Sequence, residues 1–113
     1  MIVNHILIDG TTCSGEVVLP NDVTSIGNWA FYDCVNLTGI TLPANLTELG
    51  HGAFSGCNHL INVNIPNGIT RIEDSTFSDC AILSDINIPN SVTSIGESAF
   101  SDCKKLTSIT IPD

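Results

Sequence analysis

A fixed spacing of 23 residues runs through this chain, and it constrains the fold more than any other feature. Four residue types keep the spacing in each of four copies: Thr24, Thr47, Thr70 and Thr93; Phe31, Phe54, Phe77 and Phe100; Cys34, Cys57, Cys80 and Cys103; Leu37, Leu60, Leu83 and Leu106. Five prolines follow the same step, at Pro20, Pro43, Pro66, Pro89 and Pro112. A fixed period of this length is typical of a solenoid, in which each unit forms one coil that stacks on the next.

Each unit reads V-T-x-I-G-x-x-A-F-x-x-C-x-x-L-x-x-I-x-I-P-x-x, and its parts have different periodicities. In the last copy, Ile109 and Ile111 alternate with polar residues, which predicts a half-buried strand that ends at the proline. The equivalent strands are expected near residues 38–42, 61–65, 84–88 and 107–111. Ala99, Cys103 and Leu106 recur with the period of a helix, so one or two helical turns are expected there. The V-T-x-I-G part predicts a short extended segment or turn.

The L-x-x-I-x-I strand motif resembles the leucine-rich repeat. The whole unit, with I-P after the strand and then V-T-x-I-G and A-F-x-x-C, is similar to the BspA-like (Treponema-type) subclass, and the resemblance covers residues 20–112. It implies a right-handed leucine-rich-repeat solenoid, with a parallel β-sheet on one face and short helical turns and loops on the other. It also implies a noncatalytic protein-binding or adhesion module of a surface-exposed or secreted microbial protein.

One unit departs from this pattern. The glycine of Gly27, Gly50 and Gly96 becomes Glu73, and the alanine three residues later becomes Thr76. Either the glycine position does not require a positive φ, or the third copy is strained.

Residues 1–19 do not match the unit. The stretch "HILIDGTTCSGEVVL" reads as two strands around an Asp-Gly turn, so we expect a hairpin that caps the first coil. Residues 20–113 are expected to form the four repeats of the same single domain, without a matching cap at the carboxyl end.

The charge balance excludes several classes of partner. Twelve acidic residues against three basic ones give a net charge of −9, which opposes nucleic-acid binding and binding to anionic membranes. No apolar run is long enough to span a membrane, so no membrane insertion is expected. The start "MIVNHILIDG" lacks the parts of a signal peptide. The compartment is therefore suggested only by the family resemblance, as the cell surface or the secreted fraction.

Four cysteines in register, Cys34, Cys57, Cys80 and Cys103, could suggest a metal site or disulfides. Zinc requires ligands that converge on a tetrahedron, whereas a 23-residue step sets the sulfurs in a line. Disulfides between adjacent coils fit the Cα spacing, but parallel side chains hold the Cβ atoms too far apart. We therefore expect a buried row of reduced, metal-free thiols. Cys13 lies out of register, which leaves open whether it is exposed and reactive.

No catalytic arrangement emerges. Cys57 with His51 and His59 has the composition of a nucleophile and its base, but both histidines occupy variable outward positions. We expect neither enzyme activity nor a cofactor. A row of acidic residues beside the cysteines consists of Asp33, Asp79 and Asp102, interrupted by Gly56. It reads as acidic residues in surface turns, and whether it binds cations stays open.

Candidate recognition residues lie at two places. Trp29 and Tyr32 form a compact aromatic pair in the first copy, either a recognition patch or a contact beneath the amino-terminal hairpin. The outward positions of the predicted sheet could contact a protein partner: Thr38, Thr41, Ile61, Asn62, Asn64, Asp85, Asn87 and Thr110.

The alternative function is structural. The last coil would leave one side of Phe100, Leu106, Ile109 and Ile111 without a neighbour, which favours contact with another copy of the chain or with further repeats. In this interpretation the solenoid associates end to end into homo-oligomers or spaces other domains.

Overall fold

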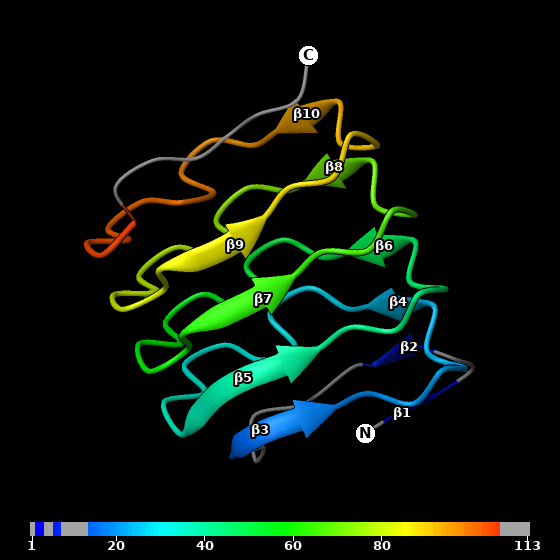
Figure 1. The fold of residues 1–113 in the computed structure, drawn as a ribbon, viewed down its shortest axis with the longest axis horizontal. Helices are drawn as coiled ribbons and strands as arrows, with labels where there is room; N and C mark the ends of the chain where they lie inside the picture. Colours follow the sequence, from blue (N-terminus) through cyan, green and yellow to red (C-terminus); the bar gives the residue numbers. More distant parts are fainter. Residues whose placement is uncertain (1, 4–5, 8–13, 107–113) are drawn as a thin grey trace.

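The computed structural model describes residues 2–3, 6–7 and 14–106, and it forms a parallel solenoid without helices in that part of the chain (Figure 1). Its strands are short: β1 Ile2–Val3, β2 Ile6–Leu7, β3 Gly15–Val18, β4 Ser25–Ile26, β5 Leu37–Thr41, β6 Glu48–Leu49, β7 Asn62–Asn64, β8 Arg71–Ile72, β9 Asp85–Asn87 and β10 Ser94–Ile95.

The predicted parallel sheet is confirmed. Strands β3, β5, β7 and β9 form it in that order, and we call it the first sheet. Gly39 pairs with Asn62 and Asn62 with Asp85, so the register advances by the repeat length. Three expected strands overlap β5, β7 and β9, while the expected strand at 107–111 lies outside the described residues. The V-T-x-I-G segments form β4, β6, β8 and β10 on the opposite side of the coils (Figure 1).

The helical turns predicted for the A-F-x-x-C part are wrong. Each unit instead has two left-handed residues there, such as Trp29 with a φ of 60° and Asp33 with a φ of 54°. The amide of Phe31, between them, donates to the carbonyl of Ala53 in the next coil, at 2.8 Å. The amide of Cys34 donates back to Phe31, three residues earlier. Left-handed residues thus turn alternate amides toward the neighbouring coil, whereas a helix would keep all of them within its own segment.

The core is a column of identical side chains. Phe31, Phe54 and Phe77 are fully buried, and their rings stack with those of the next coil at centroid distances of 5.1 to 5.5 Å. Interplanar angles of 3 to 11° show that the rings are nearly parallel. Aliphatic residues and the four cysteines of the row fill the rest of the core. A repeat without insertions places each side chain directly over its own copy.

The hairpin predicted around the Asp-Gly turn is wrong in its pairing. Both expected strands exist, but β2 pairs in parallel with β4, and β3 pairs in parallel with β5. Among the described residues, β1 pairs antiparallel with β2, with Ile2 opposite Leu7 and Val3 opposite Ile6. Because β2 and β3 each extend a different sheet, these two strands do not pair with each other as a hairpin.

The second side of the solenoid is interrupted. Strands β2, β4 and β6 form one sheet with β1, and β8 pairs separately with β10. The glycines of the pattern explain where the interruption falls. A β-carbon on Gly50 would lie 2.6 Å from the backbone of Gly27 and Asn28, so glycine permits close contact between coils, and its φ is not positive. Glu73 has a β-carbon at this position, and β8 does not join β6.

Replacing Gly50 with alanine is expected to lower the free energy of unfolding by about 1–3 kcal/mol, because the added carbon meets backbone atoms that cannot move alone. Urea unfolding followed by circular dichroism measures this. The control Asn67→Ala copies Ala44 of the preceding unit and should change stability by less than about 0.5 kcal/mol. Equal losses of stability in Gly50→Ala and Asn67→Ala would contradict the explanation that glycine permits close contact between coils.

Candidate functional site

The cysteine row lies in the core. Cys34, Cys57, Cys80 and Cys103 are buried and form no disulfides. The Sγ of Cys57 donates to the carbonyl of Phe31 at 3.1 Å, and the next two cysteines repeat this bond. Burial raises the pKa of Cys57 from 9.0 to about 12, and burial likewise raises the pKa of Cys80 and of Cys103. These thiols are bonded and protonated, which is the state least suited to nucleophilic attack. Cys13 lies outside the described residues.

His51 lies beside Glu73, apart from the buried thiol of Cys57. His51 is about half exposed, and its Nε2 lies 3.8 Å from Glu73 Oε1, whereas Cys57 is fully buried. Within residues 14–106 and the two short strands before them, no three His, Cys, Asp or Glu side chains gather as a metal site would require. The described segments also contain no helix long and apolar enough to cross a membrane.

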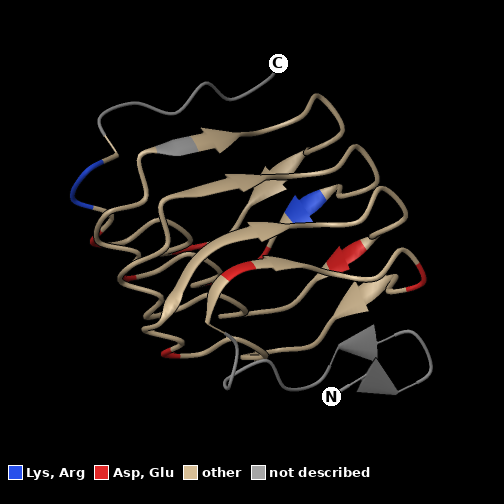
Figure 2. Ribbon diagram, turned by 60° about the horizontal axis from the view of Figure 1, so that its bottom comes forward, with Lys and Arg blue, Asp and Glu red and all other residues tan. Residues whose placement is uncertain are grey.

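The row of Asp33, Asp79 and Asp102 has a backbone explanation. All three have φ between 54 and 60°, and Gly56, which interrupts the row, has a φ of 79°. Aspartate and glycine tolerate the left-handed conformation better than most residues. Acidic residues elsewhere are spread over turns and strands, and the basic residues lie at two separate places (Figure 2).

Trp29 and Tyr32 form an edge-to-face pair with ring centroids 5.5 Å apart. Each is 48% exposed. The Trp29 ring occupies the space above Gly52 that any side chain on that glycine would fill. The described contact of Trp29 is therefore with the second coil, and half of its surface faces solvent.

The outward face of the first sheet brings most of the predicted partner-binding residues together. Thr41, Ile61, Asn62, Asn64 and Asn87 are exposed, whereas Thr38 is half-buried. A shallow groove of about 330 Å³ is lined by Thr41, Asn62, Asn64 and Asn87, along with the residues next to them in the chain, Ile40, Leu42 and Val63. The predicted Asp85 lies on β9, and Thr110 lies outside the described residues.

Sequence reasoning missed two residues of this face. Val18 is 75% exposed and pairs with Thr41, and the Glu16 side chain lies beside Asn62 over Gly39. Both belong to β3, which the sequence assigned to a cap. The segment ends at Pro20, in register with the prolines that follow the other strands, and this was the signal that could have placed it on the sheet.

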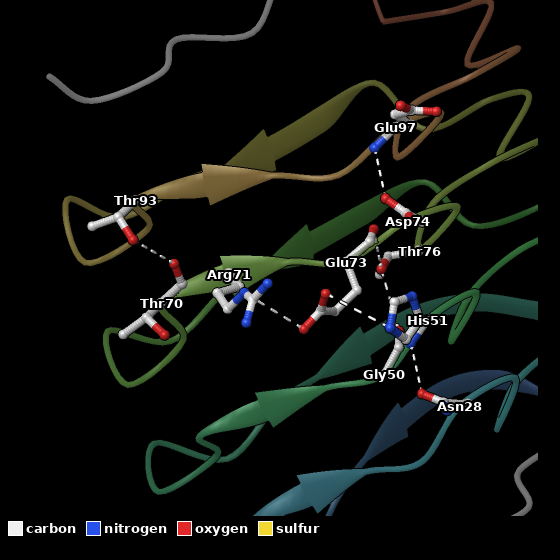
Figure 3. Close-up of polar contacts among 10 residues, drawn as sticks. All are labelled: Asn28, Gly50, His51, Thr70, Arg71, Glu73, Asp74, Thr76, Thr93 and Glu97. Carbon is white, nitrogen blue, oxygen red and sulfur yellow. Dashed lines mark hydrogen bonds and ion pairs between the residues drawn. The ribbon is translucent and has the colours of Figure 1, made fainter.

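A second groove, which sequence reasoning also missed, crosses the other side of the coils. Its volume is about 510 Å³, and backbone of Gly27 and Gly50 forms part of its lining. Asn28, Glu48, His51, Arg71 and Glu73 are the polar side chains that contribute most of its chemistry. His51 and Arg71 both point toward Glu73, with Nε2 and Nε each 3.8 Å from a carboxylate oxygen (Figure 3). The departure at Glu73 was the signal in the sequence.

The chain is similar in sequence and in fold to known leucine-rich repeat proteins. Residues 10–113 match the family model described as the BspA type leucine rich repeat region (6 copies). A leucine-rich repeat protein from Bacteroides ovatus is 32% identical over 86% of this chain and 25% of its own, with a TM-score of 0.74. The T. pallidum leucine rich repeat protein is 30% identical over 95% of this chain and 63% of its own, with a TM-score of 0.79. A search of curated proteins found no match. The chain thus spans a quarter to under two thirds of these solved relatives.

Proposed function

Because the chain belongs to the BspA-type leucine-rich repeat family, whose repeats are generally noncatalytic scaffolds for protein binding, we propose that it is a protein-binding module of the adhesion type. We place it in a surface-exposed or secreted microbial protein, as the family suggests. The partner is a protein, and the outward face of the first sheet is the surface that contacts it.

The observation that carries this proposal is the polar row across adjacent coils. Thr41, Asn64 and Asn87 pair in register on β5, β7 and β9, so the repeat sets identical or similar groups in line. Amide side chains both donate and accept hydrogen bonds, and they carry no charge that would restrict the partner. The exposed apolar groups of Val18 and Ile61 lie on the same face and add surface that a partner would bury.

The rigidity of the sheet supports the same surface. Every strand of the first sheet is hydrogen-bonded to its neighbours, and a continuous cluster of buried hydrophobic side chains lies beneath it. A rigid face loses little conformational entropy when it binds, so modest contacts give measurable affinity.

Introducing charge on this face should weaken binding of the partner. Immobilised chain would be exposed to a panel of purified extracellular-matrix and serum proteins in surface plasmon resonance. At least one should bind, and Asn64→Lys/Asn87→Lys should weaken that binding by roughly tenfold or more. The matched control is Lys104→Asn, which copies Asn58 two units earlier on the turn side. Binding that survives the lysine pair, or that responds only to the turn-side change, would contradict the proposal.

Self-association of the solenoid is the second candidate. Phe100 and Leu106 are only partly buried, whereas their equivalents Phe77 and Leu83 are fully buried. The other two residues of the proposed contact, Ile109 and Ile111, lie outside the described residues. Analytical ultracentrifugation of the same samples separates the two functions. A molar mass that rises with protein concentration, and does so equally in Asn64→Lys/Asn87→Lys, favours self-association.

A further inference from the structure

The first unit departs from the repeat on its turn side, where it has Trp29 and Tyr32. The next three units have only glycine or serine at the two equivalent positions: Gly52, Ser75 and Ser98, and Ser55, Ser78 and Ser101. These copies show that the stacking of coils requires no large side chain there. A departure from the local rule of the repeat is where function is expected.

The backbone of Trp29 makes this departure unfavourable for the fold. Its φ is 60°, in the left-handed region that glycine adopts freely and that bulky residues rarely adopt. Such conformations persist where the surrounding contacts hold them, and they are concentrated at functional sites. Stability alone would therefore favour a smaller residue at this position.

Contacts with the second coil hold the aromatic pair in place. The amides of Trp29 and Asp33 each donate to a carbonyl of that coil at 2.8 Å. The six-membered ring of the Trp29 indole lies over Gly52, and Tyr32 meets Trp29 edge to face with ring centroids 5.5 Å apart. Rings that are already fixed lose little conformational freedom when a partner binds.

About half of each ring remains available to a partner. Trp29 and Tyr32 are each 48% exposed, and Val35, three residues after Tyr32, is 44% exposed. The ring contact that the structure describes for this pair is the one within it. Tryptophan and tyrosine are the residues most often found at the points that dominate protein–protein binding energy.

The charge around the pair has one sign. Asp33 follows Tyr32 directly and is exposed. Residues 14–70 contain acidic residues but no Lys or Arg, and the three basic residues belong to the third and fourth units: Arg71, Lys104 and Lys105. A negative surface attracts cations, and the faces of tryptophan and tyrosine rings attract them as well. Both effects favour the same ligand, a cationic group.

We propose that Trp29 and Tyr32 bind an arginine side chain of a protein partner, with its guanidinium against the rings and paired with the Asp33 carboxylate. Arginine fits better than lysine because its planar guanidinium stacks on aromatic rings and pairs with a carboxylate through two N–H groups. The site lies in the turn between β4 and β5, apart from the outward face of the first sheet (Figure 1). It rests on the proposed protein-binding function, but a peptide tests it without that partner.

The fluorescence of Trp29, the chain's one tryptophan, reports binding directly. The probe is a blocked Gly-Ser peptide that contains two arginines, titrated at low salt because salt screens exposed charges. Its counterparts have citrulline or leucine in place of arginine. The arginine peptide should give a saturable change with a dissociation constant of about 0.1–10 mM. Both counterparts should bind at least roughly fivefold more weakly, because they lack the charge.

Matched variants locate the site. Asp33→Asn removes the charge and keeps a residue that tolerates the left-handed backbone. Tyr32→Ser copies the residue of the other units, so the coil already accepts it. Each should weaken binding of the arginine peptide by roughly threefold to fivefold. Asp102→Asn makes the same change of charge at the equivalent position of the fourth unit, and it should leave the affinity unchanged.

The proposal is overturned if the arginine peptide gives no fluorescence change, or if a counterpart binds as tightly. It is also overturned if Asp102→Asn weakens binding as much as Asp33→Asn does, since the peptide then responds to total charge alone. Loss of binding in Asn64→Ala/Asn87→Ala would place the peptide on the first sheet instead. If the peptide binds as expected but no protein of the panel does, the proposed function of the first sheet fails and this site stands.

Discussion

Replacing Phe54 with alanine is expected to lower the free energy of unfolding by about 3–5 kcal/mol. The Phe54 ring is fully buried and stacks on Phe31 at 5.1 Å and on Phe77 at 5.5 Å, so its removal opens a cavity that two coils border. Domains of ordinary stability have about 5–15 kcal/mol in total, so this one change could leave little of it. Urea unfolding followed by far-ultraviolet circular dichroism measures the loss.

The chain contains its own control for this prediction. Phe100 stacks on Phe77 at 5.5 Å but is only partly buried. Equal losses at the two positions would show that the stacked column is not what stabilises the coils.

Alkaline pH is expected to destabilise the fold steeply. Burial holds the pKa of Cys57 at about 12 and raises that of Cys80, so both thiols stay protonated in the folded chain. In the unfolded chain they ionise near their ordinary value of 9.0. The stability is thus complete below about pH 9 and is lost as the pH rises toward the folded pKa, by roughly 3 kcal/mol per pH unit for two thiols.

Urea unfolding at intervals between pH 7 and pH 11 checks this. Cys57→Ala/Cys80→Ala should start from a lower stability and show a much shallower decline above pH 9, since the two groups that release protons on unfolding are gone. A slope that is unchanged in this variant would assign the alkaline loss to other residues.

The regular part of the fold could be predicted because it depends on identity between units. Each phenylalanine of the column contacts its own copy, so the 23-residue step alone requires parallel stacking. The helical turns could not be excluded in the same way. Ala99, Cys103 and Leu106 face inward in turns with left-handed residues just as they would in a helix, and the pattern of apolar residues does not tell these apart.

The groove could not be predicted because it depends on distances between units. Glu73 was visible as a departure from the repeat, but its effect follows from the 2.6 Å that a β-carbon at the glycine position would leave to the neighbouring backbone. The same holds for Trp29, whose contact with Gly52 combines a bulky residue in one unit with the smallest residue in the next.

The alternating amides of the turns also give the stack a direction. There, each coil donates to the carbonyls of the coil after it, as Phe31 does to Ala53 and Phe54 does to Thr76. Near the strands the donation is reversed, as the amides of Thr47 and Thr93 bond back to the preceding coil. The two faces at which coils stack therefore differ. The donors and acceptors of one face match those of the opposite face, but they do not match a second copy of the same face. A second molecule could continue these ladders only head to tail, and a two-fold dimer would interrupt them.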